Sequence, residues 1–308
     1  MSYELALQTS GAYPALLDDA RWAEARGLTA LALPDHYVMS LNPEAVVPAY
    51  DALAQLAALA RDTTSLQLSV LVSPVTYRHP AVLAKTALTI NELSGGRFTL
   101  GVGTGWLERE HTLFGFPFPD VATRFEMMEE ALAYVRAMIT GDAAGFSGDH
   151  FVLDEAETLP SDPGLRLVVG GTGPHKTPRL AGMYADEYNC YPAPIDEFRS
   201  RVDRARSAAA EAGRDPDRLM ISSSGNVVAG RTRKEYQEVL TERAAENGMS
   251  REEAEAHLER RNTPRGTYNQ VAAQLAELTA AGMRRFYLQR PAEFDRDADE
   301  ELMAALRT

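Results

Sequence analysis

One dipeptide of the sequence stands out as a place where a proton could be moved. Asp35-His36 joins a carboxylate to an imidazole, the side chain whose ordinary titration lies near neutral pH. The imidazole could act as a general acid or base, and the neighbouring carboxylate could orient it. His36 is therefore the catalytic candidate. Asp35 could instead simply cap a loop or a helix, so the pair alone does not define a site.

Two glycine-rich segments could let a cofactor approach the backbone. In Gly101-Val102-Gly103-Thr104-Gly105, glycines at alternate positions would leave room for a flat ring or a phosphate, although tight packing between a strand and a helix would also need them. In the run Gly170-Gly171-Thr172-Gly173-Pro174-His175-Lys176-Thr177, free N–H groups precede a helix start. This second arrangement favours a phosphate site, with Lys176 and Arg179 adding positive charge.

Several other kinds of chemistry have no matching motif. His79, His111, His150 and His257 lack the spacing of metal ligands, and we expect no metal site. Cys190 is the only cysteine, which excludes a disulfide within the chain and a thiolate metal cluster. The glycines do not form a dinucleotide-binding fingerprint, and no G-x-S-x-G segment is present.

Composition narrows the class of protein further. The 308 residues are 45% hydrophobic, and 31 basic against 44 acidic residues give a formal charge of −13. A diffuse acidic surface argues against nucleic acid as a partner, which would need a clustered basic face. The first residues lack the features of a secretory signal, and no apolar run reaches the length of a membrane span. We expect a cytoplasmic protein that binds a small-molecule substrate, has no membrane partner and forms a homodimer.

The apolar pattern alternates between short strand-like runs and longer helical runs. The eight predicted strands are Tyr3–Gln8, Ala30–Leu33, Leu66–Val72, Phe98–Val102, Leu165–Val169, Glu187–Tyr191, Leu219–Val228 and Arg285–Leu288. Predicted helices follow them, with Asp51 as an N-cap, Pro80 in a first turn and Thr123-x-x-Glu126 as a capping box. Further helices are expected at Thr177–Tyr184, Ile195–Ala212 and Thr267–Ala281.

Eight such units predict a parallel sheet closed into an α/β barrel of the (β/α)8 class, spanning residues 1–308 as one domain. A doubly wound open sheet is the alternative. Residues 142–164 interrupt the rhythm and are expected to form a small hairpin before the fifth strand. Residues 230–265, after the seventh strand, are charged and helical in composition. They could be a solvated excursion or a lid over the barrel mouth.

In this order the segments resemble the luciferase-like superfamily of flavin-dependent monooxygenases and enzymes of the deazaflavin coenzyme F420. The resemblance covers nearly the whole chain. Its most specific parts are Tyr77-Arg78-His79-Pro80, Ser94-Gly95-Gly96-Arg97-Phe98, Gly101–Trp106, Glu110-His111 and Gly115-Phe116-Pro117-Phe118, followed by the run from Arg179 to Asn189.

The chain looks most similar to the F420-dependent branch, which implies a dehydrogenase or reductase that transfers a hydride through F420. The resemblance places Asp35-His36 beside the cofactor ring and a non-proline cis peptide at Ser69-Val70. The implied cofactor-binding residues are Asp35, Ser69, Val70, Leu71, Gly103, Thr104, Gly105, Gly170, Gly171, Thr172, Gly173, His175 and Lys176. An FMN-dependent monooxygenase or reductase, or a flavin-binding relative without catalysis, remains the alternative.

One departure from the F420-dependent pattern limits what the resemblance implies. Sugar-phosphate dehydrogenases of that branch have a catalytic Glu directly after Gly-Thr-Gly, where this chain has Trp106. Glu108 and Glu110 lie nearby but not at the matching position. The substrate and the proton-transfer scheme of those enzymes are therefore not carried over to this chain.

Overall fold

Eight parallel strands close into a barrel in the computed structural model, which describes residues 3–38, 49–141, 146–153, 160–290 and 294–307. The strands are, in spatial order, β1 (Glu4–Gln8), β12 (Arg285–Gln289), β9 (Met220–Gly225), β8 (Glu187–Cys190), β7 (Arg166–Gly170), β4 (Phe98–Gly103), β3 (Gln67–Pro74) and β2 (Ala30–Leu33). Because β1 pairs with both β12 and β2, the barrel is closed. The (β/α)8 prediction is confirmed, and the open sheet is excluded.

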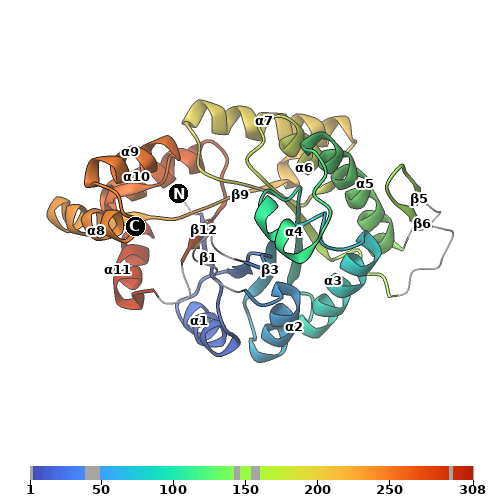
Figure 1. Ribbon diagram of the computed structural model, residues 1–308, viewed down its shortest axis with the longest axis horizontal. Helices are drawn as coiled ribbons and strands as arrows, with labels where there is room; N and C mark the ends of the chain where they lie inside the picture. Colours follow the sequence, from blue (N-terminus) through green and yellow to red (C-terminus); the bar gives the residue numbers. More distant parts are fainter. Residues whose placement is uncertain (1–2, 39–48, 142–145, 154–159, 291–293, 308) are drawn as a thin grey trace.

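Helices surround the barrel strands (Figure 1). They are α1 (Tyr13–Ala25), α2 (Ala52–Asp62), α3 (Pro80–Ser94), α4 (Glu108–Phe114), α5 (Val121–Thr140), α6 (Lys176–Tyr184), α7 (Ile195–Glu211), α10 (Tyr268–Ala280) and α11 (Arg296–Leu306). Two predicted helix starts are confirmed. Asp51 accepts a hydrogen bond from the Ala54 N–H, and Pro80 occupies the first turn of α3. Gly95, in the left-handed region at φ 67°, ends α3.

The predicted capping box of α5 is wrong. Asp120 is the N-cap, because its carboxylate accepts the N–H groups of Ala122 and Thr123 at 2.8 and 3.1 Å. Thr123 lies inside the first turn and donates its hydroxyl to the same carboxylate at 2.9 Å. An aspartate placed this way satisfies two of the free N–H groups of the helix start, so the helix begins earlier than the Thr–Glu pattern indicated.

The seventh predicted strand is two strands rather than one. β9 ends at Gly225, and β10 (Val228–Gly230) leaves the barrel to pair in parallel with β11 (Arg265–Thr267). Between β10 and β11 lie α8 (Arg233–Glu246) and α9 (Arg251–Arg260). These helices lie at the left edge of Figure 1, outside the ring of barrel strands. This placement fits the solvated excursion better than the lid.

The expected hairpin before the fifth barrel strand is present. β5 (Phe146–Ser147) pairs in an antiparallel way with β6 (Val152–Leu153). The turn between them is tied to α5, because the Glu130 carboxylate accepts the N–H groups of residues 149, 150 and 151 at 2.8 to 3.0 Å. The neighbouring ranges 142–145 and 154–159, which the hairpin prediction included, lie outside the described residues.

The main hydrophobic core lies between the strands and the surrounding helices. A second, smaller cluster fills the barrel interior and consists largely of small residues: Ala6, Ala30, Ala32, Leu71, Val168 and Tyr287. Among the described helices, none is long and apolar enough to cross a membrane.

Candidate active site

A bulge in β3 shapes the C-terminal end of the barrel. The pairing between β3 and β4 shifts between Val70 and Ser73, and the peptide bond inside this interval, Leu71-Val72, is cis. The predicted cis peptide at Ser69-Val70 is therefore wrong by two residues. Ser69 and Val70 are buried and paired in register on both sides, with β2 and with β4, so the irregular bond falls where that pairing is interrupted.

The side chain of Val72 occupies the space that three glycines leave open. A Cβ added at Gly103 or at Gly170 would lie 2.6 Å from a methyl group of Val72, and one at Gly101 would lie 2.2 Å from the Val70 carbonyl oxygen. Two of the predicted cofactor-binding glycines are thus needed for close packing within the protein. Val72 itself is only partly buried, so it forms part of the barrel mouth.

A chain of neutral hydrogen bonds from the ends of β1 and β12 holds the bulge. Gln8, at the end of β1, donates to the Leu71 carbonyl oxygen at 2.8 Å. Gln289, at the end of β12, donates to the Gln8 side-chain oxygen at 2.7 Å and to the Tyr191 hydroxyl at 3.2 Å. The carbonyl of the cis peptide bond is therefore fixed by side chains from two other strands.

Asp35 follows β2, and its carboxylate faces the protein. It is fully buried, accepts the Ser73 hydroxyl at 2.7 Å and forms an ion pair with Arg78. Arg78 also contacts the Asp51 carboxylate at 2.5 Å, which links the loop after β2 to the start of α2. Burial lowers the pKa of Arg78, but Asp35, Tyr37 and Asp51 together raise it more, so the net direction is upward and the guanidinium is charged. Asp35 thus holds the loop that carries His36.

His36 is placed by a different carboxylate. Its Nδ1 lies 2.9 Å from Glu110 Oε1, and the Tyr37 backbone N–H donates to Glu110 Oε2 at 3.0 Å. Glu110 lies in α4 and is buried, whereas 18% of the His36 side chain remains exposed. The rings of His36 and Trp106 meet edge to face, with their centroids 5.7 Å apart. His36 is thus partly exposed, held by the buried Glu110 on one side and in contact with the exposed Trp106 ring on the other.

The surroundings of Glu110 favour its charged form. Burial raises the pKa of this carboxyl, but the hydrogen bond to His36 and the contacts with Tyr77 and the Tyr37 N–H lower it below its usual range. Burial and the nearby Glu110 carboxylate raise the pKa of Tyr77, whose buried hydroxyl has no hydrogen bond of good geometry. Glu110 is therefore an acceptor of hydrogen bonds, with one neighbour on each oxygen.

The second glycine segment leaves β7 and opens α6 as predicted. The Gly171 N–H donates to the Asn189 carbonyl at 3.1 Å, and Thr172, His175 and Lys176 are exposed. The start of α6 has no side-chain cap and no acidic residue in its first turn, which suits an anion. Arg179, by contrast, is bound by Glu129 through two contacts of 3.1 and 3.2 Å, so its charge is already balanced.

Comparison with known proteins identifies the family of this chain. The family model described as luciferase-like monooxygenase matches residues 3–302. The chain belongs to this family.

Curated relatives of this luciferase-like protein include F420-dependent enzymes. An F420-dependent glucose-6-phosphate dehydrogenase of Amycolatopsis mediterranei is 29% identical over 213 residues, which are 67% of this chain and 63% of that protein. A phthiodiolone/phenolphthiodiolone dimycocerosates ketoreductase of a Mycobacterium species is 35% identical over 204 residues, 64% of this chain and 52% of the relative. The matches thus span about half to two thirds of the relatives' length.

Solved structures share the fold of the luciferase-like chain at low identity. An F420-dependent secondary alcohol dehydrogenase in complex with an F420-acetone adduct covers both chains completely, at a TM-score of 0.81 and 22% identity. The EDTA monooxygenase of Chelativorans sp. BNC1 reaches a TM-score of 0.80 at 18% identity, covering 99% of this chain and 92% of that chain.

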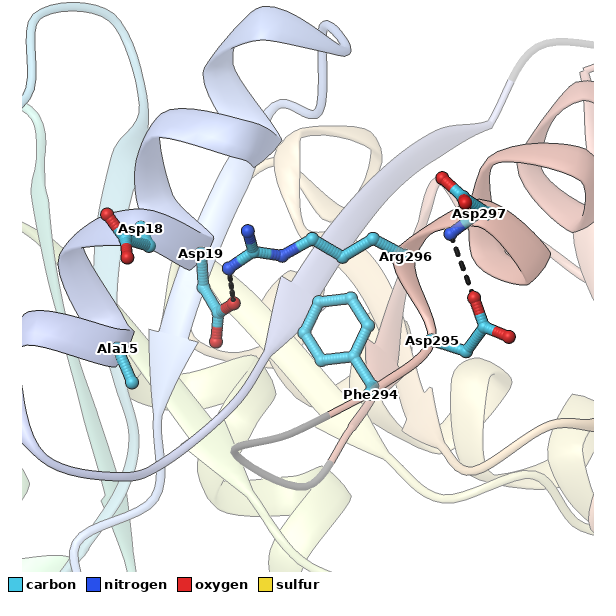
Figure 2. Close-up of a pocket in the computed structure, with 7 residues that line it drawn as sticks. All are labelled: Ala15, Asp18, Asp19, Phe294, Asp295, Arg296 and Asp297. Carbon is cyan, nitrogen blue, oxygen red and sulfur yellow. Dashed lines mark hydrogen bonds and ion pairs between the residues drawn. The ribbon is translucent and has the colours of Figure 1, made fainter.

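Two cavities of the luciferase-like chain are lined by charged side chains. One, of about 490 Å³, lies between α1 and the start of α11, and Figure 2 shows Arg296 reaching across it toward Asp19, 2.7 Å away. The other, of about 690 Å³, is formed by α6 and α7 and begins at His175 and Lys176. The second cavity is continuous with the predicted phosphate segment, whereas no predicted site residue lines the first.

The structure brings the predicted residues to one end of the barrel, because Asp35, Gly103 and Gly171 all follow or end parallel strands at their carboxyl ends. The sequence offered no reason to assign a role to Arg78, and it did not indicate that Glu110 would bond the His36 ring. Both belong to the segments that carried the family resemblance, which was the available signal. His111 is buried and satisfied on both nitrogens, by the Leu107 carbonyl and the Thr76 hydroxyl at 2.9 and 2.6 Å.

Proposed function

We propose that this chain is an F420-dependent oxidoreductase that transfers a hydride between the deazaflavin and a small organic substrate. The observation that carries the proposal is His36, a partly exposed imidazole held by a buried carboxylate at the barrel end where enzymes of this fold have their sites. F420-dependent glucose-6-phosphate dehydrogenases among the curated relatives support the choice of cofactor.

Bound F420 would supply the hydride, and the protein would supply position and a proton path. His36 would give or take the proton at the substrate oxygen or carbon, since it is a partly exposed imidazole oriented by a buried carboxylate. The bulge at Leu71-Val72 would back the ring, with Thr104 and Gly105 beside it. The exposed N–H groups at the start of α6 would hold the phosphate, and Lys176 would add a positive charge.

The cavity between α6 and α7 supports F420 over FMN. Its lining has four basic side chains (Lys176, Arg179, Arg199 and Arg204) and three acidic ones (Asp196, Asp203 and Glu211). Arg179 is bound by Glu129 and Arg199 by Asp196, so Lys176 and Arg204 would meet the tail of F420. F420 continues beyond its phosphate into an acidic oligoglutamate tail, whereas FMN ends there. A cavity that starts at the phosphate segment and carries arginines would accommodate the tail.

Trp106 argues against a sugar phosphate as the substrate of this chain. The relatives include glucose-6-phosphate dehydrogenases, but Trp106 replaces the carboxylate that the sugar-phosphate enzymes of this branch use, and it lies against His36. We therefore propose no sugar phosphate as the substrate. The exposed ring of Trp106 would instead present an apolar face to a substrate near the imidazole.

The decisive experiment is a titration of the purified protein with F420 and, separately, with FMN, followed by fluorescence. We expect tighter binding of F420, and a roughly fivefold weaker affinity in Lys176→Ala, since an exposed charge contributes about 1 kcal/mol. Lys234→Ala is the matched control, because Lys234 is an exposed lysine on α8, far from the phosphate segment. Tight FMN binding without F420 binding would replace the proposal with an FMN-dependent monooxygenase or reductase.

Turnover tests the role of His36 once binding is established. His36→Ala should still bind F420 but should lower kcat by about 10²–10⁴-fold, the usual contribution of a positioned acid or base. Single-turnover measurements on wild type and variant check this. An unchanged rate would show that the proton is handled elsewhere. Absence of turnover with every substrate in the wild type would favour a flavin-binding protein without catalysis.

A further inference from the structure

We infer that Glu110 is a positioning residue that fixes the tautomer of His36, with the proton on Nδ1 and the lone pair of Nε2 directed to the reacting atoms. The inference rests on the proposed function only for what Nε2 does. The tautomer itself is a property of the protein alone and can be measured without any cofactor.

The hydrogen bond between Glu110 and His36 determines which ring nitrogen carries the proton. Glu110 Oε1 lies 2.9 Å from His36 Nδ1, and an ionised carboxylate can only accept. Burial raises the pKa of Glu110, but its contacts with His36, Tyr77 and Tyr37 lower it overall, so the carboxyl is ionised at neutral pH. In a neutral imidazole only one nitrogen carries hydrogen, and here it must be Nδ1.

The Glu110 side chain is fixed in its orientation by other contacts. Its other oxygen accepts the Tyr37 backbone N–H at 3.0 Å, and its side chain is buried. The adjacent His111 ties α4 to the Thr76 hydroxyl and to the Leu107 carbonyl, which fixes the helix turn that carries Glu110. The carboxylate is therefore held from both sides before any ligand binds.

Asp35 is the carboxylate next to His36 in the sequence, but it does not bond the imidazole. Its side chain is bound by Arg78 and Ser73 instead. Asp35 holds the loop, whereas Glu110 bonds the ring. Trp106 lies edge-on against the same ring and restricts its rotation. The imidazole is thus fixed in both orientation and protonation.

The conservative substitution Glu110→Gln should reverse the tautomer of His36. In Glu110→Gln the side chain has one acceptor oxygen and one NH2 group in place of two oxygens. The Tyr37 N–H can only donate, so it takes the amide oxygen and leaves the NH2 group facing His36 Nδ1. Nδ1 must then accept, and the proton moves to Nε2. The variant keeps its contact with Tyr37 and its size, so it should fold.

The experiment is 15N NMR of the histidine rings in the protein without cofactor, at about pH 8, where an imidazole is normally neutral. The His36 signals are assigned by their loss in His36→Ala. We expect Nδ1–H in the wild type, Nε2–H in Glu110→Gln, and no change in the control Glu108→Gln, which alters an exposed carboxylate of the same helix. The same tautomer in wild type and Glu110→Gln, or Nε2–H in the wild type, would overturn the inference.

Activity with F420 extends the test and keeps the two claims apart. Glu110→Gln should lower kcat by about 10²–10⁴-fold with little change in F420 affinity, because a wrong tautomer removes the proton acceptor but not the cofactor site. An unchanged kcat in Glu110→Gln together with the reversed tautomer would overturn the role given to Nε2. Failure of the wild type to bind F420 would overturn the proposed function and leave the tautomer result standing.

Discussion

The two ends of the barrel each hold an arginine among carboxylates, but only the C-terminal end places an imidazole beside it. At the N-terminal ends of the strands, Arg285 contacts Glu4 at 2.6 Å, Gln67 at 2.7 Å and Glu187 at 3.4 Å. At the C-terminal ends, Arg78 binds Asp35 and Asp51 in a similar way. The difference lies in the side chain that reaches solvent, which is the Glu4 carboxylate in the first cluster and the His36 imidazole beside the second.

This comparison shows why burial of charge does not by itself mark a site. Burial lowers the pKa of both arginines, but their neighbours raise it overall: Tyr287, Glu187 and Glu4 for Arg285, and chiefly Asp35 for Arg78. Perturbed groups of this kind occur in structural ion pairs as well as in active sites. What distinguishes the C-terminal end is an imidazole that is held on Nδ1 by a buried carboxylate and whose side chain is partly exposed. Substitutions at the two ends should therefore separate effects on stability from effects on cofactor binding.

The largest effect on stability should come from Arg285 at the N-terminal end. Arg285→Ala leaves Glu187 buried without its cation, and breaking such a pair costs about 3–5 kcal/mol. Unfolding in denaturant measures the loss. Arg284→Ala is the control, since the exposed Arg284 donates only to backbone carbonyls. Equal stability of the two variants would mean that the buried cluster contributes nothing to the fold.

A smaller loss of stability is expected for substitution of Asp35, which lies at the site but whose carboxylate is buried against protein groups. Asp35→Asn removes the charge that pairs with Arg78, but Arg78 still forms its ion pair with Asp51. The free energy of unfolding should therefore fall by about 2 kcal/mol. Asp51→Asn should cost less, since that carboxylate is partly exposed. Denaturant unfolding and F420 titration of both variants check this. A change confined to cofactor affinity would restore Asp35 as a residue that contacts the ring.

The fold could be predicted from the sequence because it depends on repeated patterns. Eight alternations of strand and helix define a barrel, and caps such as Asp51 and Pro80 act locally. The pairing of side chains across strands could not be predicted in this way. Asp35 is adjacent to His36 in the chain, but Glu110, 74 residues away, bonds the ring. The position of the cis peptide was also missed, because it depends on the register between β3 and β4.

The smallest predicted effect concerns Glu24, at the same end of the barrel as Arg285. Its carboxylate accepts the N–H groups of Thr64, Ser65 and Leu66 at 2.8, 2.6 and 3.1 Å. Burial raises the pKa of Glu24, but these hydrogen bonds lower it more, so the folded protein holds the proton less tightly than the unfolded chain. The resulting stability is present above the ordinary pKa of a glutamate and is lost as the pH falls through the lowered value.

Glu24→Gln should therefore cost about 1 kcal/mol at neutral pH, because the side chain is partly exposed and solvent screens it. The difference from the wild type should shrink below about pH 4.5 and vanish in more acidic solution, where both carry a neutral side chain. Denaturant unfolding of both proteins over this range measures it, with the exposed Glu92→Gln as the control. A difference that stays constant with pH would show that the shape of Glu24, and not its charge, holds the loop between α2 and β3.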